Sequence, residues 1–121
     1  MAQHNLFGKQ GEQLAKDFLE KSGYEILDEN WISGKSEIDL IVFKDRKIIF
    51  VEVKTRSGNF FGQPEEFVNS AKQKHMVIAA EEYIHLMSHQ GEIRFDIVSI
   101  LFDRSGNHTL KHIEDAFWPA G

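Results

Sequence analysis

Four charged residues stand near the ends of two apolar runs that follow one another in the sequence. Glu37 and Asp39 lie in the first run, and Glu52 and Lys54 lie in the second. In proteins, hard divalent cations such as Mg²⁺ are commonly bound by carboxylates. A lysine beside such an ion can orient a water molecule or help to deprotonate it. These residue types indicate metal-assisted hydrolysis if the fold brings the two runs together.

The two runs are rich in β-branched and aromatic residues, are too short for helices, and are joined by a charged segment at 44–47. This pattern predicts a β-hairpin. A two-residue or a four-residue loop within that segment gives the same register, in which the numbers of facing residues sum to 91. Asp39 then faces Glu52, and Glu37 faces Lys54.

One face of the predicted hairpin is wholly apolar, because successive side chains of a strand point to opposite faces. It comprises Ile38, Leu40, Val42, Ile49, Val51 and Val53. The opposite face carries the four charges and then continues in apolar residues, namely Ile41, Phe43, Ile48 and Phe50. We therefore expect another element to cover it, and charges under cover need partners or a metal. Facing carboxylates would lie about 4.5–5.5 Å apart, where like charges are destabilising, and a bound cation would remove that conflict.

A solvated outer face is the alternative for this cluster. Glu37 and Lys54 would then form a cross-strand ion pair that contributes at most about 1 kcal/mol. The apolar continuation of the same face and the placement of the charges at one end only favour a cleft at the rim of a packed sheet.

Length and composition limit the classes of function. With 121 residues, of which 41% are hydrophobic, the chain is expected to form one domain over residues 1–121. It has no cysteine, so metal ligands must be oxygen or nitrogen, and a reducing cytoplasm is compatible with this. No signal peptide is evident, and no apolar run approaches the roughly 20 residues of a membrane helix. We expect a cytoplasmic protein without a membrane partner.

The net charge of −5 argues against a protein that holds nucleic acid mainly through bulk electrostatics, because Lys and Arg drive phosphate binding. Basic residues nevertheless gather between Lys44 and Lys74, where seven of the chain's 14 lie with four acidic residues. We expect a local basic surface around the acidic cluster. Its candidate contacts to nucleic acid are Arg56, Lys72, Gln73 and Lys74.

The chain before the hairpin predicts a helix over 5–22, with Asn5 as its N-cap, and a strand over 24–31. Gly8 and Gly11 cost about 1 kcal/mol each inside a helix, which suggests that another backbone or a ligand approaches near Glu12. The alternative is that Glu12 merely pairs with a lysine one turn later.

After the hairpin, a glycine-punctuated loop at 55–64 carries Phe60 and Phe61, which either stack on bases or pack into the core. A second helix is expected over 65–88, and strands over 93–102 and 109–113. The expected buried face of that helix is Phe67, Ala71, Val77 or Ile78, Ala80 or Glu81, Ile84 and Met87.

The spacing of Asp39 from Glu52-Val53-Lys54, with an apolar strand before the second group, resembles the signature of the PD-(D/E)XK nucleases, the restriction-endonuclease-like superfamily. The flanking sequence resembles the small YraN-like bacterial family, which is similar to archaeal Holliday-junction resolvases and is assigned to nucleases largely by analogy. This second resemblance covers nearly the whole chain and rests on Gly11-Glu12, Ser36 to Ile41, Phe50 to Arg56, Gly62-Gln63-Pro64, Lys72 and Arg94 to Val98.

The resemblance implies an α/β fold in which a central mixed β-sheet with an antiparallel three-stranded meander is flanked by helices, in the order α-β-β-β-α-β-β. It implies a nuclease that uses Mg²⁺ or Mn²⁺ to hydrolyse DNA, with branched or junction DNA as the substrate of the similar resolvases. Those junction-resolving relatives act as dimers, so a homodimer is expected by analogy.

The same resemblance implies Asp39 and Glu52 as metal ligands and Lys54 as the catalytic lysine, with Glu12 and Glu37 as additional carboxylates. The backbone carbonyl of Val53, between Glu52 and Lys54, is a further candidate ligand. Two positions depart from the pattern without removing a functional group, namely Ile38 at the superfamily's proline and Ser36 at the usual glycine.

Two other functions fit the sequence. One is a nucleic-acid-binding module that keeps the nuclease fold without catalysis, and the other is a structural protein with a charged rim. Metal-dependent cleavage separates the nuclease from both, and DNA binding in chelator separates the binding module from the structural protein.

Overall fold

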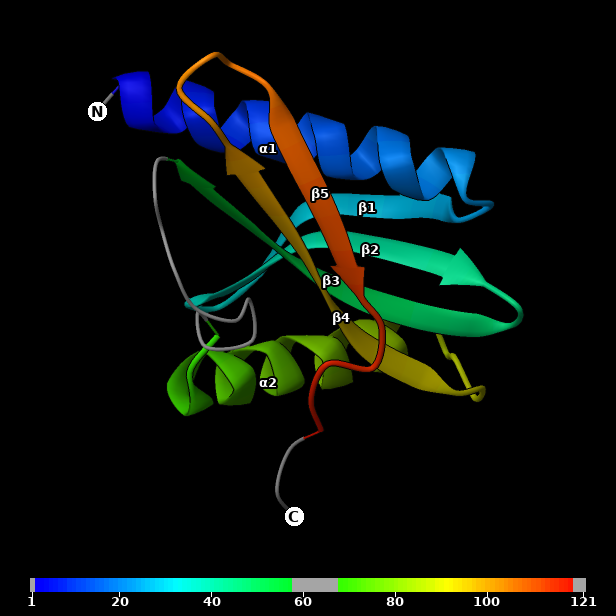
Figure 1. Cartoon of the computed structure of the whole chain (residues 1–121). Helices are drawn as coiled ribbons and strands as arrows, with labels where there is room; N and C mark the ends of the chain where they lie inside the picture. The colour runs from blue at the N-terminus through cyan, green and yellow to red at the C-terminus, as the bar shows by residue number, and fades with distance from the viewer. Residues whose placement is uncertain (1, 58–67, 119–121) are drawn as a thin grey trace.

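The structure, a computed structural model, describes residues 2–57 and 68–118, with side chains from Gly8 onward. It contains two helices and five strands (Figure 1). In chain order they are α1 (Ala2–Lys21), β1 (Glu25–Ser33), β2 (Ser36–Lys44), β3 (Lys47–Ser57), α2 (Ser70–Leu86), β4 (Ile93–Phe102) and β5 (His108–Ile113). Neither helix is long and apolar enough to cross a bilayer.

The five strands form one mixed sheet in the order β1-β2-β3-β4-β5. The first three pair antiparallel as a meander, β3 pairs parallel with β4, and β4 pairs antiparallel with β5. Parallel neighbours need a crossover connection, and α2 lies in the one between β3 and β4. The two helices lie on opposite faces of the sheet (Figure 1). The predicted fold class and element order are confirmed.

The hairpin of β2 and β3 has the predicted register. Its pairs run from Leu40 with Val51 to Lys44 with Lys47, and the numbers in each pair sum to 91. Asp45 and Arg46 have φ angles of 52° and 67°. Positive φ at both central positions is typical of the two-residue type I′ loop, whose twist matches that of the strands.

The sheet separates two apolar cores. Beneath α1, side chains of the hairpin pack against Ala15 and Leu19. Beneath α2, the other hairpin face packs against buried residues that include Met76, Ala79 and Tyr83. The face that carries the charges is therefore covered along its apolar part, as predicted.

The face assigned to Ile38 was wrong. Strict alternation places it with Leu40 beneath α1, but it packs in the core beneath α2. The ladder between β2 and β3 ends at Leu40 and Val51, and beyond it the Asp39 side chain bonds to the β3 backbone. The regular alternation of β2 does not continue past the end of that ladder.

Helix α2 differs from its prediction in its start and its face. It begins at Ser70, because the side chain of Asn69 accepts a hydrogen bond from the Lys72 amide at 2.9 Å and caps the helix there. Of the residues expected to be buried, Ala71 and Met87 are exposed. Of the two alternatives, Val77 packs against the core and Ala80 is buried, and the buried residues Met76, Ala79 and Tyr83 were missed. Apolar residues occupy several sides of this helix, so their spacing alone does not select one stripe. Phe67 lies outside the described residues.

The remaining boundaries differ by a few residues. Helix α1 already begins at Ala2, so Asn5 lies inside it and is not its cap. Strand β1 extends to Ser33, beyond the predicted end at residue 31, so it connects to β2 by a turn at Gly34-Lys35, where Gly34 has a φ of 60°. Strand β4 has the predicted bounds, and β5 starts one residue early.

Candidate functional site

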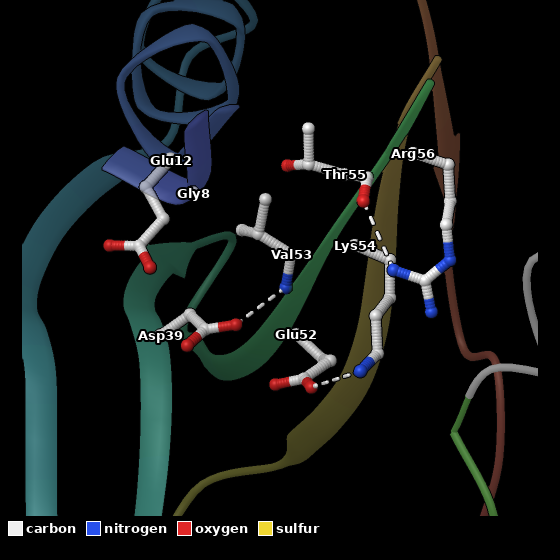
Figure 2. A pocket seen from close by; sticks show the side chains of 8 residues that line it. All are labelled: Gly8, Glu12, Asp39, Glu52, Val53, Lys54, Thr55 and Arg56. Carbon is white, nitrogen blue, oxygen red and sulfur yellow. Dashed lines mark hydrogen bonds and ion pairs between the residues drawn. The ribbon is translucent and has the colours of Figure 1, made fainter. Parts of the chain in front are cut away.

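A cavity of about 220 Å³ opens between the N-terminal half of α1 and the C-terminal half of β3. Gly8 and Glu12 of α1 form one wall, Asp39 of β2 contributes to its floor, and residues 52–56 of β3 complete the lining. Figure 2 shows the carboxylate of Glu12 turned toward that of Asp39. The charged end of the predicted hairpin therefore forms a polar cavity at the rim of the sheet.

Two glycines of α1 shape this cavity in different ways. A Cβ atom at Gly11 would collide with the Thr55 side chain, so glycine is needed for α1 to approach β3. A Cβ atom at Gly8 would meet nothing within 4 Å, and Gly8 lines the cavity. The prediction named another backbone or a ligand, but the atoms close to Gly11 belong to the Thr55 side chain, and Gly8 borders open space.

Asp39 is held by the backbone of the neighbouring strand. Its carboxylate oxygen Oδ2 accepts a hydrogen bond from the Val53 amide at 2.8 Å, and the residue is only 8% exposed. The predicted pairs of Asp39 with Glu52 and of Glu37 with Lys54 are not part of the ladder, which ends one pair earlier. The Asp39 side chain therefore accepts the hydrogen bond of the Val53 amide, which the backbone ladder of β2 and β3 does not use.

The pKa of Asp39 is raised to about 7, chiefly by burial and then by the negative charge of Glu52. The Val53 amide and the charge of Lys72 act in the opposite direction. The pKa of Glu12 is also raised, first by burial and then by the charge of Asp39. The acidic groups are thus close enough to oppose one another's ionisation, and a cation among them would favour their charged forms.

Glu52 is the most buried acid of the cavity, at 3% exposure. Among the described residues, its Oε1 is the one buried side-chain nitrogen or oxygen without a hydrogen-bond partner. Lys54 Nζ lies 3.5 Å from Oε2, and Lys72 Nζ lies 3.6 Å from Oε1. Direct ammonium–carboxylate hydrogen bonds measure about 2.7–2.9 Å, so the two lysines compensate the charge of Glu52 at longer range.

Most of the predicted site residues meet at this cavity, and Glu37 does not. Glu37 is exposed, pairs with Ile32 in the ladder of β1 and β2, and does not line the cavity. The ion pair between Glu37 and Lys54 that the alternative of a solvated face required is absent from the described residues, where Lys54 pairs with Glu52. The charge of Glu37 still contributes to the raised pKa of Glu12, after burial and Asp39.

The predicted nucleic-acid contacts separate into two groups. Arg56 lines the cavity, and Lys72 reaches Glu52 from α2. Gln73 donates a hydrogen bond to the Val68 carbonyl at 3.0 Å, and Lys74 is exposed. The loop residues Phe60 and Phe61 and the segment Gly62-Gln63-Pro64 lie outside the described residues.

Of the basic residues between Lys44 and Lys74, those at the hairpin turn lie away from the acidic cluster. Lys44, Arg46 and Lys47 lie at the turn of the β2–β3 hairpin, at the other end of β3 from Lys54. At about 3.3 Å per residue, the seven steps from Lys47 to Lys54 span roughly 23 Å. Lys44 is also engaged there, because its Nζ donates to the Ser22 carbonyl at 2.8 Å.

A buried polar network beneath α1 was not predicted. Asp96, which is fully buried, accepts two bonds from Arg94 at 2.8 Å and contacts His112 Nε2 at 2.7 Å. Burial alone would raise the pKa of Asp96, but the hydrogen bonds from His112 and Arg94 lower it overall. The signal in the sequence was an aspartate and an arginine within a mostly apolar strand. None of these residues lines the cavity, so the network holds β4 and β5 together.

The donor set of the cavity fits a hard divalent cation. In the described ranges no three His, Asp or Glu side chains lie close enough to form a ligand set by themselves. Asp39, Glu52 with its unbonded Oε1, and the Val53 carbonyl offer oxygen donors from two strands. Mg²⁺ commonly binds through one or two carboxylates and keeps several waters.

Comparison with known proteins identifies a family. The model of "Uncharacterised protein family UPF0102" matches residues 11–100. A UPF0102 protein of Bacteroides fragilis is 43% identical over 119 residues, and one of Flavobacterium psychrophilum is 46% identical over 118 residues, each covering 98% of both chains. Among solved structures, Pyrococcus furiosus SfsA in complex with Ca²⁺ is similar at 15% identity and a TM-score of 0.37, covering 92% of this chain and 63% of that one.

Proposed function

We propose that this chain, which belongs to the UPF0102 family and through it to the restriction-endonuclease-like superfamily, is a nuclease that hydrolyses DNA phosphodiester bonds with Mg²⁺ or Mn²⁺. The observation that carries the proposal is the pair of buried carboxylates in one polar cavity, Asp39 with a raised pKa and Glu52 with an unbonded oxygen. Such a pair is costly without a cation, because buried charges need partners.

The carboxylates of Asp39 and Glu52 and the carbonyl of Val53 would hold the ion. When bound, a divalent ion lowers the pKa of the attacking water and offsets charge on the scissile phosphate. The backbone amide of Val53 orients Asp39 for this task through its 2.8 Å hydrogen bond. Because that amide belongs to β3, it keeps the ligand from β2 in a fixed position beside the ligand from β3.

Lys54 would serve the attacking water and the phosphate. Its side chain is 24% exposed, lines the cavity, and lies beside Glu52, so its ammonium can reach both the ligand set and an incoming anion. An ammonium stabilises negative charge that develops on the phosphate oxygens in the transition state. Glu12, on the opposite wall, provides a further carboxylate at the edge of the same space.

The basic groups at the cavity support DNA as the substrate. Lys54 and Arg56 line it and Lys72 approaches it, so phosphate oxygens would meet cations around the acidic ligands. The resemblance to junction resolvases makes branched DNA the first form to test, and a homodimer the assembly to look for. The overall charge of −5 predicts weak binding with strong dependence on salt.

The test is a panel of duplex, single-stranded, flap and four-way-junction DNAs incubated with Mg²⁺, Mn²⁺ or chelator. We expect metal-dependent cleavage of at least one of them by the wild type and by Glu81→Gln, a control that removes an exposed carboxylate of α2. Asp39→Asn should abolish it. Absence of cleavage throughout the panel, or equal cleavage in chelator, would contradict the proposal, and binding without cleavage would indicate the non-catalytic module.

A further inference from the structure

Lys72 reaches the candidate metal site from a helix that contributes nothing else to it. The side chain of Asn69 caps α2 and fixes its first turn, because it accepts a hydrogen bond from the Lys72 amide at 2.9 Å. From there the Lys72 side chain extends to the sheet, where its Nζ lies 3.6 Å from Glu52 Oε1. Its backbone is thus held by the cap, whereas its four-carbon side chain keeps several rotatable bonds.

The two oxygens of Glu52 face two different lysines. Oε2 lies 3.5 Å from Lys54, which lines the cavity, and Oε1 lies 3.6 Å from Lys72, which does not. With Asp39 and Glu52 ionised, two negative charges are thus matched by two positive charges before any metal arrives. A divalent ion that binds here therefore meets carboxylates whose charge the two lysines already neutralise.

Lys72 and a metal ion would compete for the same oxygen. Oε1 is buried and accepts no hydrogen bond, so Lys72 attracts it without satisfying its lone pairs. An Mg²⁺ ion binds a carboxylate oxygen at about 2.0–2.1 Å and brings its own waters. An ammonium 3.6 Å from the same oxygen would then lie within a few ångströms of a doubly charged cation, which strongly repels it.

We propose that Lys72 is the resident counter-cation of the metal site, neutralising Glu52 in the metal-free protein and leaving Oε1 when a divalent ion binds. The inference rests on the proposed metal site of the nuclease. It adds that the site binds its metal ion in competition with Lys72. The lysine stabilises the metal-free fold and weakens metal binding. Its displaced ammonium stays near Glu52 and adds positive charge there for a phosphate.

The test is calorimetric titration of the metal-free protein with Mn²⁺ alone. We compare wild type with Lys72→Gln and Lys72→Met, two neutral variants of which the second keeps a long flexible side chain. Removing one like charge a few ångströms from the ion should tighten Mn²⁺ binding about tenfold. Lys72→Arg keeps the charge and should bind like wild type. Lys74→Gln, which removes an exposed lysine two residues away, should also bind like wild type.

Thermal unfolding of the same proteins gives a second readout. In chelator both neutral variants should unfold at a lower temperature than wild type. Saturating Mn²⁺ should raise the unfolding midpoints of these variants by more than it raises that of wild type. Neutral variants that bind Mn²⁺ no more tightly than wild type would overturn the proposal, as would an equal gain in Lys74→Gln. The titration needs no DNA. If the protein binds Mn²⁺ but cleaves no DNA, the proposed nuclease activity is contradicted, and the titration still tests the role of Lys72.

Discussion

The Asp39 carboxylate accepts a hydrogen bond from the Val53 amide at 2.8 Å, at the point where the pairing of β2 with β3 has ended. This contact joins an acidic side chain of one strand to the backbone that precedes Lys54 in the other. It also places Asp39 next to Glu52 in a buried setting, where the pKa of Asp39 rises to about 7. The acid is therefore held in a position that is unfavourable for its charge unless a cation is present.

Asp39→Asn should stabilise the metal-free protein above neutral pH. Unfolding returns the pKa of Asp39 from about 7 to its ordinary 3.8, so between these values the unfolded chain releases a proton that the folded protein keeps. Stability of the wild type therefore falls as pH rises through that window, and the loss is complete above it. Asparagine cannot ionise, yet its oxygen can still accept the Val53 amide.

Thermal unfolding in chelator at about pH 5 and about pH 8 checks this. The advantage of Asp39→Asn over wild type should be larger at the higher pH, while Asp17→Asn, an exposed change on α1, should show no such trend. A variant less stable than wild type at the higher pH would show that the charge of Asp39 is already compensated.

Gly8 and Gly11 should respond oppositely to alanine. Gly11→Ala forces a Cβ into the Thr55 side chain and should cost about 1–3 kcal/mol of unfolding free energy. Gly8→Ala meets no atom and should stabilise the helix by up to about 1 kcal/mol. Denaturant titration measures both, and Thr55→Ala made together with Gly11→Ala should recover part of the loss. Equal effects of the two alanines would contradict the described approach of α1 to β3.

Lys54→Met should separate metal binding from chemistry. The lysine lies 3.5 Å from Glu52 and would act on the water and the phosphate, so Mn²⁺ affinity should change little while single-turnover cleavage falls by about 10²-fold or more. Lys47→Met, at the other end of β3, is the matched control. Because Lys54 pairs with Glu52 and Glu37 lies elsewhere, Glu37→Gln should not compensate the change. A folded Lys54→Met protein with full cleavage would exclude the catalytic role.

Much of the fold could be predicted because its signals are local. The β-branched runs and the charged turn between them determine the hairpin and its register, and the alternating run at 93–102 determines β4. Asp39, Glu52 and Lys54 meet because they lie on two adjacent strands, although the ladder ends one pair before Asp39 and Glu52.

Features that depend on distant contacts were missed. The end of the β2–β3 ladder, and with it the face of Ile38, depends on a side-chain bond of Asp39 that alternation does not encode. Packing against the sheet determines which side of α2 is buried, and there Tyr83 packs against Trp31. Because α2 has apolar residues on several sides, its sequence alone does not identify that side. The reach of Lys72 to Glu52 depends in turn on where that helix is capped.

The most direct test of the account is to measure Mn²⁺ affinity and DNA cleavage on wild type and Glu52→Gln from the same preparations. Glutamine keeps the shape of Glu52 and removes its charge, so the variant can fold while the site loses a ligand. We predict that Glu52→Gln loses Mn²⁺ binding and cleavage together. Cleavage by a folded Glu52→Gln protein at the wild-type rate would contradict the assignment of this cavity as the active site.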